Sequence, residues 1–407
     1  AVLCGLRGIL YRACRACGAE NGGSQHSGYT YVCEAQTAVR GREPSAERML
    51  VCVAQTHFSL TYLQQKHVNM PYLTSKLKFY RNEEPHLAEK LKIISLGGLN
   101  EIGKNITVLE YGKDIIIVDC GLGFPEDDMY GVDLVIADMT YLVKNKQKIR
   151  GMFLTHGHED HIGGIPYAMQ QFNCPIHATR LTAGIVRLKL EEHRLDKTVK
   201  LFTHEAGETV KAGCFSVEFI HVNHSIADAV SFAIRTPVGT VVITGDFKID
   251  PTAEDGMIDL TRFGELGREG VLALLCDSTN VERPGFTPSE RIVANSFDRQ
   301  FAGCSQRIIV TTFASNAFRL QSIISAAHKY GRKVAVTGRS MENVLKVSVE
   351  LGYLKIPNGT LVDINAIKSL PHGLLHSQAC GDPARRPDHH LRLRHSRQRK
   401  GHRPHHQ

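Results

Sequence analysis

One stretch organises the sequence, Leu154-Thr155-His156-Gly157-His158-Glu159-Asp160-His161-Ile162-Gly163-Gly164, which brings three histidines and an aspartate into six positions. The residues before it, from Ile149 to Thr155, are largely apolar and β-branched, a pattern that predicts a buried strand. The glycines at its end, followed by Pro166, predict a loop that turns into a helix. The polar side chains are therefore expected at the C-terminal end of a strand, where α/β sheets place their functional sites.

The spacing divides this cluster into two ligand pairs. His156 and His158, two positions apart in an extended turn, can point at one metal, while Asp160 and His161, adjacent at the start of the helix, can reach a second. A lone His-x-His is usually an accident, but this denser set has almost no purely structural explanation. Imidazole and carboxylate ligands suit zinc, and manganese less well. We therefore expect two divalent metal ions, with zinc preferred.

Two later residues can complete the ligand set. His224 lies between two expected strands, Phe215–Val222 and Val230–Arg235, and such a histidine is more often a packing or surface residue. Here a metal cluster still lacks ligands, so His224 is predicted to be one. Asp246 follows an apolar run that predicts a buried strand, and each of its two carboxylate oxygens could take one cation. We predict that Asp246 bridges the two metals.

Two other aspartates follow expected strands. Asp119 ends the run Ile115–Asp119, where it could cap a turn, orient a metal-bound histidine, or do both. Asp277 follows the run Val271–Cys276 and is as well explained as a cap as it is as a site residue.

The pattern changes beyond about residue 290 to alternating strands and helices, which predicts an α/β region with parallel strands. The expected elements are Arg307–Thr312, Asn316–Tyr330, Lys333–Thr337 and Met341–Leu351. The loop Thr312–Ala317 joins a strand to a helix N-terminus, where free backbone N–H groups favour a phosphate. Taken alone, this loop could equally be an ordinary helix cap.

Charge and cysteine content limit the functional classes. The chain has 407 residues and a formal net charge of +8, but residues 70–371 hold 34 Lys and Arg against 35 Asp and Glu. The basic excess belongs to the two ends, so it is no argument for nucleic-acid binding by the core. Five of the eleven cysteines lie in the first 52 residues, and the Cys14/Cys17 pair lacks the partners of a zinc site. With no apolar run of about 18 residues and no clear signal peptide, we expect a reduced, cytoplasmic protein without a membrane span.

Both ends of the chain differ from its centre. Residues 1–69 show no sustained periodicity, and we expect a non-native or disordered leader before a natural start at Met70; a genuine extension is the alternative. Residues 372–407 hold eight histidines and seven arginines without apolar periodicity. A reading-frame slip after about residue 371 explains this break better than a histidine-rich metal-binding tail. The expected domains are therefore residues 70–290 and an incomplete domain over residues 291–371.

Several motifs together resemble the ribonuclease J family, whose members combine a metallo-β-lactamase fold with an inserted β-CASP domain. They are Leu96-Gly-Gly-Leu-Asn-Glu-Ile-Gly-Lys-Asn105, Asp119-Cys-Gly, Thr155–Gly164, Asn223-His-Ser-Ile226, Gly245-Asp-Phe-Lys248, Asp277-Ser-Thr-Asn280, Thr312-Phe-Ala-Ser-Asn316 and Gly338-Arg-Ser-Met-Glu342. The likeness runs from about residue 90 to residue 371. It implies an αββα sandwich followed by the start of the α/β insertion.

The resemblance also implies roles for individual residues. His156, His158 and His224 would hold one metal, Asp160 and His161 the other, and Asp246 would bridge them. Ser315-Asn316-Ala317 would touch the RNA backbone. Family members act as 5′-to-3′ exonucleases and endonucleases in messenger turnover and ribosomal RNA maturation, and they oligomerise through a C-terminal domain. The family's further metal-binding histidine and its catalytic histidine segment are not recognisable here, so no general acid is assigned.

Three alternatives share some of these features. A thioesterase or glyoxalase-type hydrolase would share the ligands but should lack the insertion beyond residue 290. A non-catalytic RNA-binding protein could keep the insertion and lose ligands, yet all six expected ligands are present. A DNA-directed β-CASP nuclease stays open, and comparing RNA with matched single-stranded DNA would separate it from a ribonuclease.

Overall fold

The computed structural model describes residues 89–126, 128–253 and 255–369. It also gives the backbone of four short strands outside these ranges: β1 (Val32–Ala35), β2 (Val51–Cys52), β18 (Leu375–Gln378) and β19 (His390–Leu391). Among the described residues, no helix is both long and apolar enough to cross a bilayer.

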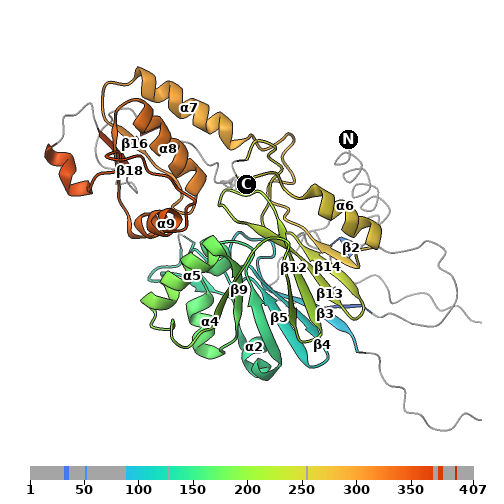
Figure 1. Cartoon of the computed structure of the whole chain (residues 1–407). Helices are drawn as coiled ribbons and strands as arrows, with labels where there is room; N and C mark the ends of the chain where they lie inside the picture. Colours follow the sequence, from blue (N-terminus) through green and yellow to red (C-terminus); the bar gives the residue numbers. More distant parts are fainter. Residues whose placement is uncertain are drawn as a thin grey trace, which may run out of the picture.

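Two sheets lie face to face and form the larger body of the molecule (Figure 1). The first has the order β1-β3-β4-β5-β8-β9-β10, with β3 (Leu91–Gly97), β4 (Ile106–Tyr111), β5 (Asp114–Val118), β8 (Ile149–Phe153), β9 (Ile176–Thr179) and β10 (Leu201–His204) after β1. The second has the order β11-β12-β13-β14-β15-β2, with β11 (Thr209–Ala212), β12 (Phe215–His221), β13 (Val230–Thr236), β14 (Gly239–Ile243) and β15 (Ala273–Leu275). Hairpins give antiparallel pairing on one side of each sheet, while β5, β8, β9 and β10 run parallel.

The core between the sheets follows from the alternation of side chains along each strand. Phe153 of β8, Phe219 of β12 and Phe232 of β13 are fully buried here, and their ring centroids are 5.0 to 6.3 Å apart. Two of these contacts are edge-to-face, an arrangement that is favourable beyond the area it buries. They tie the first sheet to the second at its centre.

Helices cover the outer faces of both sheets. α2 (Thr140–Lys144), α4 (Ile165–Gln171) and α5 (Arg180–Glu192) share a buried cluster with the first sheet, and Leu266 of α6 (Leu260–Glu269) packs on the second. The remaining short elements of this body are β6 (Leu122–Gly123), β7 (Val135–Ile136), η1 (Lys146–Lys148) and α3 (Glu159–Ile162). The result is the αββα sandwich expected from the sequence, which is thereby confirmed.

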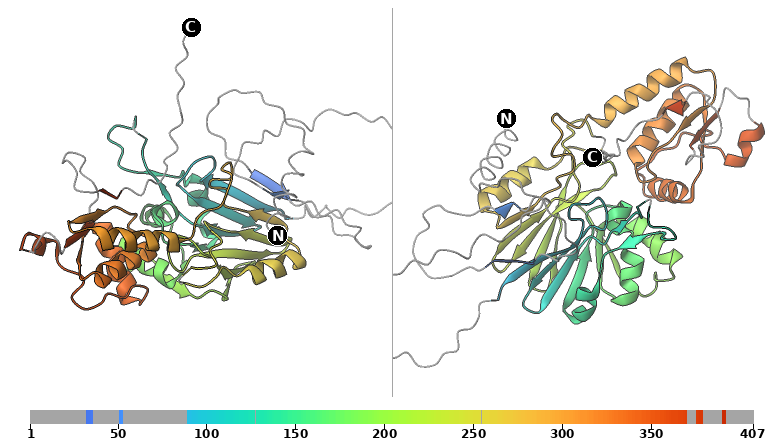
Figure 2. Two further views of the ribbon diagram at one scale, coloured as in Figure 1. Left: turned by 90° about the horizontal axis from the view of Figure 1, so that it is seen from above. Right: turned by 180° about the vertical axis from the view of Figure 1, so that it is seen from behind.

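A smaller α/β body stands beside the sandwich in all three views (Figures 1 and 2). It contains α7 (Glu290–Gly303), β16 (Ile308–Val310), α8 (Ala317–Lys329), β17 (Lys333–Val336), α9 (Arg339–Glu350) and η2 (Ile364–Ser369). Its strands are all parallel, in the order β17-β18-β16-β19, as the alternating strand and helix pattern predicted. A separate apolar cluster that includes Phe297, Phe301 and Leu320 forms its core.

The two bodies meet where α9 packs on α5. Val344 and Val347 of α9 belong to the buried cluster of the sandwich rather than to that of the smaller body. Gly184 of α5 makes this approach possible, because a Cβ at this position would lie 2.6 Å from Val347 Cγ1. The junction is therefore an apolar helix pair that depends on a missing side chain.

Some short strands come from segments for which the sequence predicted no regular pattern. β1 and β2, from residues 1–69, pair with β3 and β15 at the edges of the two sheets, and β18, beyond Pro371, pairs between β17 and β16. The remainder of these segments, including Cys14 and Cys17, lies outside the described residues. The predicted leader, the domain boundaries and the reading-frame slip stay predictions.

Candidate metal centre

The histidine-rich loop follows β8 directly and ends in the single turn of α3. Small residues let neighbouring backbone approach it. A Cβ on Gly121 would overlap the carbonyl oxygen of Asp160, and a Cβ on Gly245, whose φ is +57°, would lie 2.8 Å from Thr155 Cβ. These glycines are required because two other loops must reach the ligand loop closely enough to contribute side chains.

His156, His158 and His224 form the first ligand group. Nε2 of His156 lies 3.0 Å from Nδ1 of His158, and Nε2 of His224 lies 3.1 Å from the same atom. His156 is fully buried, and the other two are partly buried. Three ring nitrogens that converge in this way can serve one cation.

The second group lies beside the first and contains His156, His161 and Asp246. Oδ1 of Asp246 lies 3.4 Å from Nε2 of His161, whereas Oδ2 lies 3.7 Å from Nε2 of His224. Asp160 Oδ2 is 3.6 Å from Nε2 of His161. The structure thus brings together all six residues that the sequence singled out, and the two oxygens of Asp246 face different groups.

Asp119 orients His161. Oδ2 of Asp119 lies 2.8 Å from Nδ1 of His161, and the backbone N–H and side-chain hydroxyl of Thr155 both donate to the same carboxylate at 2.8 Å. The carboxylate accepts from Nδ1–H, so Nε2 of His161 is left to face Asp160 and Asp246. Asp119 adopts a left-handed φ of 61°, which is uncommon outside glycine and is held here by these contacts.

Asn105 contacts Asp160 and His161, although the sequence analysis assigned it no role. Its side-chain Nδ2 donates to the carbonyl oxygen of Asp160 at 3.0 Å and lies 3.2 Å from Nε2 of His161. Its backbone N–H donates to the same carbonyl at 3.1 Å. Asn105 was visible in the sequence only as the last residue of the Leu96–Asn105 motif, because an isolated asparagine carries no ligand spacing.

Burial sets the protonation of the first group. Burial and the neighbouring His161 lower the pKa of His158 to about 4, and burial together with His158 lowers the pKa of His224 to about 3. Burial also holds the pKa of His156 well below its ordinary value. All three rings are therefore neutral near pH 7, as metal ligands must be.

The second group is charged. Burial lowers the pKa of His161, but the carboxylates of Asp246 and Asp119 raise it by more, so that the net pKa is well above its ordinary value. Burial raises the pKa of Asp246, but His161 and the other histidines outweigh burial and hold it below its ordinary value. A proton on His161 thus balances negative charge that a cation would otherwise neutralise. The donor set fits two divalent cations.

Other polar residues near the cluster have different partners. Glu159, between His158 and Asp160, pairs with Lys189 of α5 at 2.6 Å. Asp277 accepts from the backbone N–H of Thr279 at 2.8 Å, which makes it the turn cap that was one of its two expected roles.

The expected RNA contacts lie at the start of α8. Asn316 is buried, and its side chain accepts from the backbone N–H of Arg319 at 3.0 Å as the helix cap. Ala317 is also buried, so Ser315 is the partly exposed member of the three. Contact of this loop with RNA stays a prediction, and the geometry limits it to Ser315 and backbone groups.

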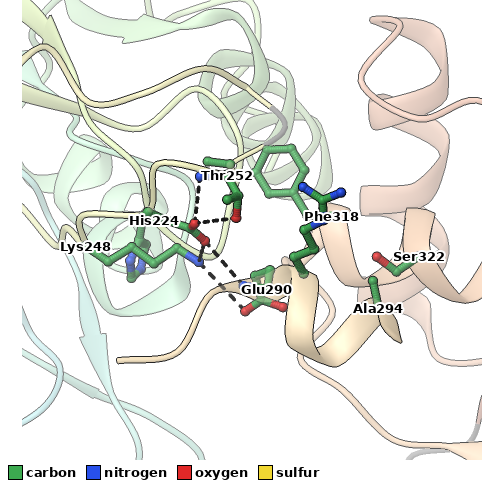
Figure 3. Close-up of a pocket in the computed structure, with 10 residues that line it drawn as sticks. His224, Lys248, Thr252, Glu290, Ala294, Phe318 and Ser322 are labelled. Carbon is green, nitrogen blue, oxygen red and sulfur yellow. Dashed lines mark hydrogen bonds and ion pairs between the residues drawn. The ribbon is translucent and has the colours of Figure 1, made fainter. Parts of the chain in front are cut away.

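A cavity of about 270 Å³ opens between the sandwich and the smaller body, next to the first ligand group (Figure 3). Residues of both bodies line it: His224, Lys248, Asp250, Thr252, Ala253, Glu290, Arg291, Ala294, Phe318 and Ser322. Its wall therefore includes a candidate metal ligand together with cationic and anionic side chains.

One ion pair, Lys248 with Glu290, crosses this cavity from one body to the other. Nζ of Lys248 lies 3.5 Å from Asp250 Oδ2 and 4.0 Å from Glu290 Oε1, as the dashed lines in Figure 3 show. Glu290 in turn accepts from the nearly buried Arg319 at 2.8 Å. The loop that carries Asp246 is thereby linked to the first residues of α7 and α8.

Fold and ligand set together define the class as the metallo-β-lactamase superfamily. Residues 99–290 match that superfamily, and residues 305–381 match the family described as "Ribonuclease J, beta-CASP domain". A solved protein of unknown function from Enterococcus faecalis V583 shares the fold, with a TM-score of 0.52 at 16% identity over 72% of this chain and 78% of that one.

Curated relatives give the particular family. The chain is 51% identical over 286 residues to "Ribonuclease J" of Synechocystis sp., which covers 70% of this chain and 45% of the relative. It is 48% identical to "Ribonuclease J 1" of Streptococcus pyogenes, over 68% of this chain and 50% of that one, and 46% identical to "Ribonuclease J" of Thermus thermophilus, over 70% and 51%. The chain belongs to the ribonuclease J family, and it spans about half the length of the curated relatives it matches.

Proposed function

We propose that this chain provides the metal centre of a ribonuclease that hydrolyses RNA phosphodiester bonds, as a 5′-to-3′ exonuclease and an endonuclease in messenger turnover and ribosomal RNA maturation. The observation that carries the proposal is Asp246, whose two oxygens face different histidine groups at 3.4 and 3.7 Å. The names of the relatives support RNA as the substrate. We further propose zinc as the metal, with manganese as the alternative, a cytoplasmic location and a homo-oligomeric whole protein.

When bound, two divalent cations supply a lowered pKa for the attacking water and stabilise charge on the phosphoryl oxygens. The chain's own residues prepare the site for this. His156, His158 and His224 present neutral nitrogens, and Asp119 fixes His161 in one orientation. Apart from the loss of the proton on His161, the site therefore needs little reorganisation when it is loaded.

The substrate would enter between the two bodies. The cavity beside His224 places Lys248 and Arg291 within reach of a phosphodiester, and Phe318 offers an apolar face. Ser315, just before α8 of the smaller body, would contact the RNA backbone. RNA held there would have its scissile phosphate next to the ligand cluster.

Asp246→Asn tests the proposal. Loss of residues that merely orient ligands typically costs 10- to 100-fold in metal affinity, so losing a bridging carboxylate should cost at least about 100-fold in cleavage of 5′-monophosphorylated RNA. Asp138→Asn is the matched control, because Asp138 is an exposed carboxylate that accepts from the backbone of Thr140, and asparagine can keep that bond.

The assay compares zinc with manganese and RNA with single-stranded DNA of the same sequence. Full activity in the Asp246→Asn variant would contradict the metal centre. Equal cleavage of RNA and DNA would favour a nuclease without preference for RNA, and cleavage of DNA alone would overturn the assignment of the substrate.

A further inference from the structure

The loop from Asn223 to Asp228 holds the metal ligand His224 on one side and contacts the smaller body on the other. It joins β12 to β13, and its apolar residues Ile226 and Ala227 are buried in the cluster that includes α5. Ile226 also packs against the ligand loop, since a Cβ on Gly157 would lie 3.2 Å from Ile226 Cδ1. The position of His224 is therefore tied to how this loop is held at its end.

Asp228 closes the loop in a strained conformation. Its φ of 68° lies in the left-handed region, which a residue with a Cβ adopts only when its surroundings hold it there. Two contacts from the sandwich do so: Thr179 Oγ1 donates to the Asp228 carbonyl oxygen at 2.7 Å, and the Leu181 N–H donates to Oδ2 at 3.1 Å. Both donors lie at the junction of β9 and α5.

The third contact comes from the smaller body. The hydroxyl of Tyr353 donates to Asp228 Oδ2 at 2.8 Å, across 125 positions of sequence. Burial and the Asp228 carboxylate raise the pKa of Tyr353, so the hydroxyl keeps its proton and stays a donor. Tyr353 follows α9, the helix whose Val347 packs against Gly184 of α5.

We propose that Tyr353 is a positioning residue for the metal centre: through Asp228 it fixes the loop that presents His224, so docking of the smaller body raises metal affinity at the first ligand group. Tyr353 touches neither a ligand nor the cavity, and it acts only through Asp228. The inference rests on the metal centre of the proposed function, but not on the identity of the substrate.

Tyr353→Phe tests this role, because it removes the hydroxyl and keeps the ring. Partners that orient ligands typically change metal affinity by 10- to 100-fold; since Asp228 keeps its other two contacts, we expect one Zn²⁺ dissociation constant to rise about 10-fold. The measurement is competition for Zn²⁺ with a chromophoric chelator, without RNA, on the whole 407-residue chain.

Tyr330→Phe is the matched control. The Tyr330 hydroxyl also donates to an aspartate, Asp298 Oδ1, at 3.1 Å, but both residues lie within the smaller body. It should leave both Zn²⁺ dissociation constants within about twofold of the unmodified chain, even where its melting temperature falls as far as that of Tyr353→Phe.

Three outcomes would overturn the proposal. Unchanged Zn²⁺ affinity in Tyr353→Phe, or an equal loss in both tyrosine variants, would contradict the role of Tyr353 while leaving the metal centre in place. An unmodified chain that binds no Zn²⁺ would overturn the metal centre and the role of Tyr353 together.

Discussion

At the scale of single residues, the candidate ligand cluster depends on side chains that are not themselves candidate ligands. Asp119 accepts from three donors, two on Thr155 and one on His161, and it does so at a backbone conformation that few residues adopt. The hydrogen bond from Nδ1 of His161 to Asp119 fixes the orientation of the ring, and so it determines where Nε2 points.

We therefore predict that Asp119→Asn weakens metal binding by about 10- to 100-fold. An amide has one acceptor oxygen and one donating NH2 group, so turned one way it directs N–H at His161 Nδ1 and moves the ring proton to Nε2. Turned the other way, it directs N–H at the donating backbone of Thr155. Zinc titration of the purified variant measures the effect.

Asp114→Asn is the control on the same strand. Asp114, at the other end of β5, accepts from Arg150 Nε at 2.5 Å and from the backbone N–H of Cys214 at 2.8 Å. It should change stability but not metal affinity. If the two variants lost zinc affinity equally, the orienting role of Asp119 would be disproved.

At the scale of elements, the helix pair of α5 and α9 joins the two bodies, and its closeness depends on Gly184. Glycine within a helix normally costs about 0.5–1 kcal/mol relative to alanine. In α5 the close packing of Val347 on Gly184 offsets this cost. Val347 is a stiff β-branched residue, so its side chain cannot easily move aside.

Gly184→Ala should therefore destabilise the chain by about 1–3 kcal/mol despite its better helix propensity, because the new methyl group overpacks the junction. Gly264→Ala in α6 is the control: Gly264 is exposed, a methyl group added to it would meet nothing within 4 Å, and the change should stabilise by about 0.5–1 kcal/mol. Urea unfolding gives both free energies. Stabilisation in both variants would show that α9 does not pack tightly on α5.

Element types were largely predictable from the sequence, because the spacing of apolar residues along a long segment indicates whether it forms a helix or a strand. The helix expected over residues 316–330 is α8, over residues 317–329, and the one expected over residues 341–351 is α9, over residues 339–350. The strand expected over residues 271–276 shrinks to β15, over residues 273–275, since only these residues pair with β14. Apolar runs show which residues can form a strand, but the neighbouring strand decides how many do.

At the scale of the whole molecule, the candidate ligands come from loops of both sheets, and they could be predicted most directly where ligand types are close in sequence. His156 to His161 were evident from spacing, and His224 and Asp246 followed because the cluster lacked ligands. Asn105 and Tyr353 could not be found in this way, since the contacts that single them out are made only in the folded chain. The burial of Asn316 could not be predicted either, because the same residue at this position suits both a helix cap and a substrate contact.

Because the ligand loops span both sheets, metal binding should stabilise the whole sandwich. Free Zn²⁺ at about 100 times its dissociation constant adds about 2.7 kcal/mol, which corresponds to a rise of about 5 °C in melting temperature for a body of this size. His156→Ala combined with His158→Ala should remove most of that rise. An equal rise in the double variant would place the zinc elsewhere.

The size of this stabilisation should depend on pH through His161. His158 and His224, with pKa values of about 4 and about 3, are already neutral at pH 6, whereas the carboxylates around His161 hold its pKa well above its ordinary value against the effect of burial. Zinc must displace that proton, so lowering the pH weakens binding and raising it through the pKa of His161 strengthens binding. With free Zn²⁺ fixed by a metal buffer, the increment in melting temperature should be larger at about pH 8 than at about pH 6. An increment that stays constant between these pH values would mean that His161 is not protonated in the metal-free protein.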